Sequence, residues 1–310
     1  AILHLLYSRF FTRALNYKNK KFNLKEPFEG LFTQGMVCHK TYKDHNNNWL
    51  SPEEVDTKDG INYFQKKYPD KKVTVGSSES MSKSKKNTID PEKIIENYGA
   101  DSARLFILSD SPPEKDVQWS DEGIISSFKF IQKLWILNEN ILQEISKNYT
   151  ADSSQKILKF TNQFIKKMTD NLTSFSYNVL IANIHEMHSF LSKEIKNGYT
   201  KKTIEENYCK ILTTLLPIIP HFALECIEKN NFKINQFWPS YNKDLLMEDD
   251  IKYVIQINGK KRALINAKRD ISEDNLLKEI KKNINLIKYL ENKEFNKVIF
   301  IKNKLMNIII

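Results

Sequence analysis

The chain has 310 residues, of which 40% are hydrophobic and 28% charged, and its formal net charge is +10. This composition excludes a disordered chain and predicts two or three folded domains. Only five of the 48 basic residues are arginine, so a coding bias toward lysine explains the charge as well as a nucleic-acid partner does.

The first 37 residues are predicted to form a helix followed by an extended apolar segment at 30–37. Apolar residues recur at helical spacing at Ile2, Leu3, Leu6 and Phe10. Because the chain opens on this pattern without an initiating methionine, we expect a buried helix and a fragment of a longer protein.

Residues 38–78 are polar and rich in turn-forming residues, which predicts a small inserted subdomain. Residues 44–48 predict the tip of a hairpin, residues 51–54 the start of a helix, and Pro69 with Asp70 a further turn.

A short cationic loop, Met81-Ser82-Lys83-Ser84-Lys85-Lys86-Asn87, follows within residues 79–118. Met81 can anchor the loop, while the hydroxyl and ammonium groups after it can contact an anion. Asp90 and Pro91 predict the cap and first position of a helix that Gly99 ends, and Asp101 is predicted to cap the next helix. A solvated surface loop is the alternative interpretation.

The pattern becomes helical between residues 119 and 238. Ser120, Asp121 and Glu122 form a capping signature, and amphipathic runs follow at 155–172, 178–196 and 203–229. These runs predict a helical bundle.

Residues 239–310 predict a small α+β domain. Alternating apolar residues precede Asn258 and Gly259, a pair typical of a tight hairpin turn. Ser272 predicts the start of a helix to about residue 291, and strands are predicted at 297–301 and 305–310. The fold class is therefore multidomain: α/β, then an all-α bundle, then α+β.

Two classes of protein are not favoured. Cys38, Cys209 and Cys226 are widely spaced without a CxxC pair, which predicts reduced thiols in a cytoplasmic protein and no metal site. The strongest apolar run, 215–223, contains two prolines and a histidine, so no membrane partner is expected.

Six segments in collinear order resemble the C-terminal half of bacterial leucyl-tRNA synthetases, which are class I aminoacyl-tRNA synthetases. They are residues 34–37, 81–87, 98–104, 111–114, 217–221 and 256–260. Met81 to Ser84 match the family's KMSKS loop, and the likeness covers essentially the whole chain.

The resemblance implies five regions. Residues 1–37 would be the remnant of a partial Rossmann-type catalytic domain, 38–78 an inserted subdomain, and 79–118 the KMSKS loop and stem-contact region. Residues 119–238 would form an anticodon-binding-type bundle, and 239–310 a C-terminal tRNA-binding domain.

The resemblance also implies ATP-dependent activation of leucine and its transfer to tRNA(Leu), with ATP and its Mg²⁺ counter-ion but no other cofactor. Lys83, at the second motif lysine, would be the catalytic residue that stabilises charge on the leaving pyrophosphate. The implied ATP contacts are Met81, Ser82, Lys83, Ser84 and Lys85. Ser80 replaces the first motif lysine.

Two further sites follow from the resemblance. His4, Gly35, Met36 and Val37 would line the substrate pocket, with packing as the alternative role. Basic residues clustered around the hairpin would contact tRNA phosphates, or would be ordinary exposed charges; these are Lys260, Lys261, Arg262, Lys268 and Arg269.

The chain contains no HIGH-type motif, so we expect it to need the missing N-terminal half of the enzyme for activity. The expected partners are that half, tRNA(Leu), ATP and leucine. A stand-alone tRNA-binding module and part of a synthetase for isoleucine, valine or methionine are the alternatives.

Overall fold

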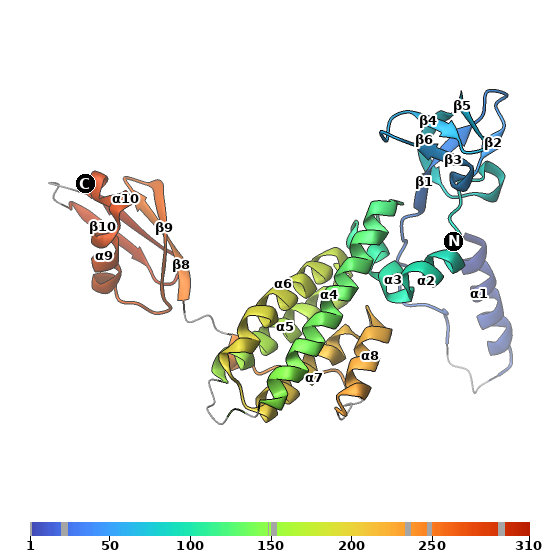
Figure 1. The fold of residues 1–310 in the computed structure, drawn as a ribbon. Helices are drawn as coiled ribbons and strands as arrows, with labels where there is room; N and C mark the ends of the chain where they lie inside the picture. The colour runs from blue at the N-terminus through green and yellow to red at the C-terminus, as the bar shows by residue number, and fades with distance from the viewer. Residues whose placement is uncertain are drawn as a thin grey trace. The chain divides into compact units, whose positions relative to one another are not determined.

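The computed structural model describes residues 2–19, 24–147, 149, 154–232, 237–246, 250–290 and 295–310. The chain divides into two compact units, residues 1–154 with 164–239 and residues 155–163 with 240–310. Figure 1 shows the elements of both units, which are described separately here.

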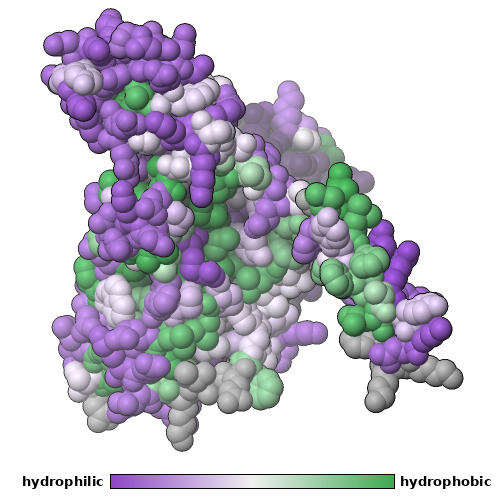
Figure 2. All heavy atoms as spheres, turned by 90° about the vertical axis from the view of Figure 1, so that its right-hand side faces the viewer, coloured by the Kyte–Doolittle hydropathy of each residue, from purple (hydrophilic) through white to green (hydrophobic). Residues whose placement is uncertain are grey.

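The first unit begins with α1 (Ile2–Asn16), which confirms the predicted helix. The expected burial is wrong, because no residue of α1 is buried, and Ile2 and Phe10 are 76% and 65% exposed. Hydrophobic side chains of this helix reach the surface (Figure 2). Helical periodicity predicts an apolar face, but it does not supply a partner that covers the face.

The cationic loop extends from a sheet of four strands. β1 (Val37–Lys43) pairs antiparallel with β2 (Trp49–Leu50) and β6 (Thr74–Ser80), and parallel with β7 (Val117–Gln118). The predicted hairpin tip at 44–48 is confirmed between β1 and β2. The loop follows β6, and β7 comes some thirty residues after the loop. Because β6 and β7 both pair with β1, the segment between them begins and ends beside the same strand.

A second sheet contains the antiparallel strands β3 (Val55–Thr57), β4 (Tyr63–Gln65) and β5 (Tyr68–Lys72). The helix predicted at 51–54 is a single 3₁₀ turn, η1 (Pro52–Glu54). The turn predicted at Pro69 and Asp70 is wrong, because both residues lie within β5. Proline is tolerated there because β5 is at the edge of its sheet.

Two short helices, α2 (Pro91–Tyr98) and α3 (Ala100–Ser109), follow the loop. Asp90 caps α2 as predicted, since its side chain accepts a hydrogen bond from the backbone N–H of Glu92 at 3.0 Å. Gly99 separates the helices with φ of 80°. Asp101 does not cap α3, because it lies in the first turn of that helix and binds another element.

The bundle contains α4 (Asp121–Ser146), α5 (Gln155–Thr173), α6 (Tyr177–Glu194), η3 (Ile195–Asn197), α7 (Lys201–Leu215) and α8 (Pro220–Lys229). Residues 155–163 of α5 belong to the second unit. Ser120 caps α4 as predicted. The run predicted at 203–229 is two helices, because Pro217 and Pro220 cannot continue the backbone ladder. No helix within the described ranges has the length and apolar character to cross a membrane.

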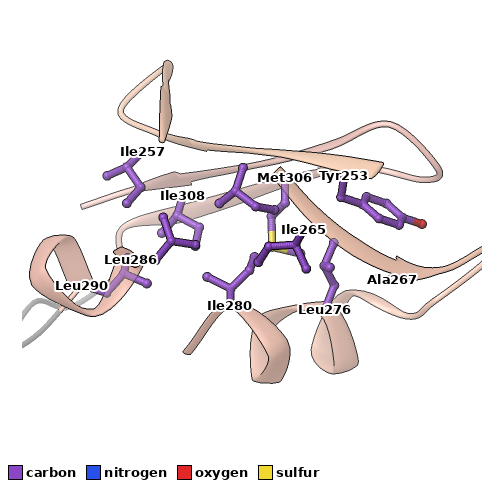
Figure 3. Packing of buried hydrophobic residues seen from close by; sticks show 11 residues of the cluster. Tyr253, Ile257, Ile265, Ala267, Leu276, Ile280, Leu286, Leu290, Met306 and Ile308 are labelled. Atoms are coloured by element: carbon purple, nitrogen blue, oxygen red, sulfur yellow. The ribbon is translucent and has the colours of Figure 1, made fainter. Parts of the chain in front are cut away.

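The second unit also contains η4 (Lys243–Leu246) and a four-stranded sheet in the order β10-β11-β8-β9. Its strands are β8 (Asp250–Ile257), β9 (Lys260–Lys268), β10 (Lys297–Ile301) and β11 (Leu305–Ile309). Figure 3 shows the core between this sheet and its helices, which includes Tyr253, Ile255, Ile265, Leu276, Ile280, Met306 and Ile308.

The helix predicted after Ser272 is two helices, α9 (Glu273–Lys282) and α10 (Ile284–Leu290). Ser272 caps α9 as predicted, and Asn283 leaves helical geometry at its end. The predicted end at residue 291 lies outside the described residues.

Candidate functional site

The cationic loop, residues 81–87, starts as a continuation of the β1–β6 pair. The backbone N–H of Met81 donates to the carbonyl oxygen of Val37 at 3.1 Å. A single 3₁₀ turn, η2 (Lys83–Lys85), follows, and Lys86 then reverses the chain with φ of 55°. The start of the loop is therefore fixed by the sheet, while η2 projects from it.

Asn87 fixes the other end of the loop. Its side chain is fully buried, at 0% exposure. The Nδ2 group donates to the carbonyl oxygens of His39 and Glu79, both at 3.2 Å, and Oδ1 accepts from the backbone N–H of Ser82 at 2.9 Å. One buried amide thus joins β1, β6 and the loop. Sequence reasoning missed this role, because the partners of Asn87 include a residue 48 positions away.

The lysines of the loop have different surroundings. Lys83 is exposed and forms no ion pair with the part of the chain that the structure describes. Lys85 forms an ion pair with Glu79, and both side chains are more than half buried, at 39% and 37% exposure. The loop therefore presents Lys83 freely and holds Lys85 against a carboxylate.

The ionised state of Glu79 favours its pairing with Lys85. Hydrogen bonds from Lys85 and then from Ser77, whose Oγ donates to Oε1 at 3.1 Å, lower the pKa of Glu79. The carboxylate is therefore charged at neutral pH. Ser82 and Ser84 share a hydroxyl hydrogen bond of 2.7 Å across the turn, and Ser80 lies opposite Cys38 in the sheet.

The segment Gly35 to Val37 lies beside the loop, as the Val37–Met81 bond shows, and is joined to residues 113–117. The N–H of Gly35 donates to the carbonyl of Pro113 at 2.9 Å, and that of Met36 to a carboxylate oxygen of Asp116 at 2.8 Å. A Cβ atom on residue 35 would lie 2.0 Å from the carbonyl oxygen of Lys115. Only glycine allows this backbone approach.

In the described part of the chain, His4 has no recorded contact with the loop. Its ring stacks on Phe28, with a centroid distance of 5.9 Å, on the exposed helix α1. No hydrogen bond or ring contact among the described residues joins it to residues 35–37 or 81–87. The predicted pocket residues are therefore divided between two places.

Asp101 and Arg104 connect α3 to the bundle. The Asp101 carboxylate accepts hydrogen bonds from the backbone N–H groups of His221, at 3.3 Å, and Phe222, at 2.7 Å. It therefore caps α8 rather than its own helix, and its charge suits the positive end of α8. Arg104 donates to the carbonyl oxygens of Pro217 at 2.6 Å and Ile218 at 2.8 Å.

The basic residues of the second unit do not form one cluster around the hairpin. Lys260 and Lys261 lie at its turn, whereas Lys268 ends β9 and Arg269 follows it. Seven residues along a strand separate Lys261 from Lys268 by about 24 Å. The Arg262 guanidinium lies 4.5 Å from the centroid of the Tyr289 ring.

No group of three or more histidine, cysteine, aspartate or glutamate side chains suited to a metal ion was found in the described ranges. Lys83 and Lys86 are exposed lysines of a loop whose two ends are both anchored, and Lys83 is the one that lies in η2.

Two family models match the chain. The model of class I tRNA synthetases for isoleucine, leucine, methionine and valine matches residues 60–120, which include the loop. The model of the anticodon-binding domain of tRNA ligases matches residues 154–282, from α5 into α9.

The curated relatives that match include leucine–tRNA ligases. The Zymomonas mobilis protein is 39% identical over 309 residues, which cover 100% of this chain and 36% of the relative. The Rickettsia felis protein is 41% identical over 315 residues, covering 100% of this chain and 37% of the relative. The chain therefore spans somewhat more than a third of the length of these relatives.

A solved structure shares the fold. The LeuRS–tRNA–LeuAMS ternary complex of Agrobacterium radiobacter K84 matches with a TM-score of 0.66 and 20% identity, covering 99% of this chain and 36% of that one. This likeness confirms the predicted multidomain fold class. The relatives and the two family models together support a close similarity of this chain to a C-terminal portion of class I leucine–tRNA ligases.

Proposed function

We propose that the chain supplies the ATP-contacting loop and the tRNA-binding surfaces of a leucine–tRNA ligase. The complete protein would join leucine to ATP, release pyrophosphate, and transfer the leucyl group to tRNA(Leu). The observation that carries the proposal is Lys83, which is exposed and unpaired within the described chain, on a loop anchored at both ends.

Lys83 is the proposed catalytic residue. Negative charge grows on the pyrophosphate as it leaves, and an ammonium group fixed near that position stabilises the transition state more than the bound substrate. Ser82 and Ser84 can donate hydroxyl hydrogen bonds to phosphate oxygens, while Met81 holds the loop on β1. Mg²⁺ would arrive as the counter-ion of ATP.

Gly35, Met36 and Val37 are proposed to form a wall of the leucine pocket, because they border the start of the loop. His4 would join them only if the rest of the protein brings α1 to that wall. The pairing of Gly35 with Pro113 supports a fixed backbone here, since the segment is held from both sides.

The exposed apolar face of α1 supports the proposal that another protein segment binds there. Ile2, Leu3, Leu6, Phe10 and other apolar residues on this helix are more than half exposed. Contiguous apolar surface of this kind marks an interaction site. We propose that the N-terminal half of the ligase covers it in the cytoplasm, which favours the enzyme over a stand-alone tRNA-binding module.

The test is pyrophosphate exchange with leucine and ATP. We expect no exchange from the 310 residues alone, and exchange when the N-terminal half of a leucine–tRNA ligase is added in trans. In that complex, Lys83→Ala should lower the rate by about 10²- to 10³-fold, as expected for loss of one transition-state donor.

Lys86→Ala is the matched control, because Lys86 is also an exposed lysine of the loop but lies after η2. It should change the rate far less. Ser80→Lys should leave the rate unchanged or raise it. An unchanged rate in Lys83→Ala, or exchange by the isolated chain, would contradict the proposal.

For tRNA, we propose that Lys260, Lys261 and Arg262 contact phosphates at one end of β9, with Lys268 and Arg269 contacting others further along. Lys261→Ala and Lys268→Ala should each reduce the dependence of log affinity on log salt by about one. Unchanged salt dependence in both variants would contradict these contacts.

A further inference from the structure

Lys85 occupies an ion pair in a loop that is proposed to bind phosphate. Its ammonium group contacts Glu79, which is the penultimate residue of β6. An ammonium on a carboxylate must leave it, at least in part, before it can contact a phosphate. Phosphate binding by Lys85 therefore includes the cost of breaking this pair.

The surrounding contacts restrict how the pair can open. Asn87 Nδ2 donates to the backbone carbonyl of Glu79, which fixes the backbone beneath the carboxylate. Ser77 donates to Oε1 of Glu79 at 3.1 Å, which keeps one carboxylate oxygen in place. Lys85 has a long side chain and lies in η2, so it is the partner that can move.

From this geometry we infer that Glu79 is a positioning residue that competes with the phosphate of ATP for Lys85. In the phosphate-free chain it holds Lys85 at the side of the loop and leaves Lys83 to meet the anion first. When phosphate binds, the ammonium of Lys85 moves from the carboxylate toward the phosphate, and no covalent bond changes. The role rests on the proposed function, because it requires the loop to bind phosphate.

The competition has an unusual consequence. Solvent and salt screen the effect of a distant negative charge on anion binding, whereas Glu79 contacts one lysine of the loop directly. Most of the effect of removing Glu79 should therefore disappear when Lys85 is absent. An ion pair that remains partly open to solvent is weak, so the expected effect is modest.

The experiment is a titration of the full 310-residue chain with inorganic pyrophosphate at low ionic strength, followed by calorimetry. Glu79→Gln keeps the shape of the side chain and should bind pyrophosphate about two- to five-fold more tightly than the parental chain. Lys85→Met should weaken binding. In the Lys85→Met background, Glu79→Gln should have a much smaller effect.

Glu53→Gln is the matched control, because Glu53 also pairs with a lysine, Lys93 at 2.7 Å, and the substitution changes the net charge equally. It should leave the affinity unchanged. As a direct readout, the ¹⁵N signal of the Lys85 ammonium should shift on adding pyrophosphate to the parental chain, toward its position in Glu79→Gln.

The outcomes separate the two proposals. If Lys83→Ala weakens pyrophosphate binding but Glu79→Gln behaves like Glu53→Gln, the role of Glu79 is wrong and the phosphate loop stands. If Glu79→Gln acts equally in the Lys85→Met background, the role of Glu79 is again wrong. If neither Lys83→Ala nor Glu79→Gln alters binding, both proposals fail.

Discussion

The loop at 81–87 and the hairpin turn at 258–259 are both turns bearing lysines, but different interactions determine their shapes. The hairpin needs only Asn258 and Gly259, whose φ angles of 49° and 76° reverse the chain between paired strands. The loop needs Asn87, whose amide reaches β1 and β6. The hairpin turn is therefore specified by its own residues, and the loop by strands distant in sequence.

Their charges differ in the same way. Lys85 in the loop is held by Glu79, whereas Lys260 and Lys261 at the hairpin form no ion pair within the described residues. A site that must align one phosphate benefits from fixed partners. A surface that contacts a polyanion through charge alone does not require them.

The largest expected effect comes from breaking the anchor of the loop. Asn87→Ala should lower the local stability of residues 79–87 by about 3 kcal/mol, because two part-buried carbonyls and an N–H lose their partner. Hydrogen exchange of these amides measures the change. Asn46→Ala, at an exposed position of the β1–β2 turn, is the control and should have little effect. Equal protection in both variants would show that the loop is shaped locally after all.

The next effect concerns the strand that supports the loop. Gly35→Ala should lower the stability of β1 and β7 by about 2 kcal/mol, since the added Cβ collides with backbone rather than a movable side chain. The matched control is Gly30→Ala, because a Cβ there meets no atom within 4 Å. Exchange protection of β1 should fall only in the first variant, and an equal loss in both would refute the close approach.

A smaller effect is expected at the hairpin. Gly259→Ala places a side chain on a residue with φ of 76° and should destabilise the second unit by about 1 kcal/mol. Gly259→Asn should cost less, because asparagine tolerates this backbone region. Amide exchange in β8 and β9 is the measurement, and residues 81–87 should be unaffected. Any loss of protection in the loop would show that the hairpin turn and the loop are not independent.

The smallest effect is a dependence on pH. The pKa of Glu79 is lowered in the folded chain, so its ion pair stabilises the loop above the usual glutamate range and is lost as pH falls through the lowered pKa. A ¹³C titration of the Glu79 carboxylate should therefore have a midpoint below that of an ordinary glutamate. Lys85→Met should raise the midpoint, and an unchanged midpoint would contradict the pairing.

The sequence predicted those features that depend on neighbouring residues. Asp90, Ser120 and Ser272 cap the helices expected of them, and Asn258 with Gly259 forms the expected turn. Features that depend on distant partners could not be predicted in this way.

Asp101 illustrates the limit. Its place after Gly99 is typical of a cap, yet its carboxylate binds the N-terminus of α8, 120 residues away. The same holds for Glu79, whose partner is clear only once β6 and the loop are folded, and for Gly35, whose contact is a backbone from another segment. The helix α1 could be predicted as amphipathic, but not as uncovered.

Arginine is scarce in this chain, with five among 48 basic residues, and Arg104 shows what lysine could not replace. Its planar guanidinium donates hydrogen bonds to two successive carbonyl oxygens at the junction of α7 and α8. A lysine there would bring a single rotatable ammonium and could not match both oxygens in one orientation. Most basic residues of this chain are lysines. Position 104 is therefore a place where the fixed direction of two hydrogen-bond donors, rather than positive charge alone, is the property required.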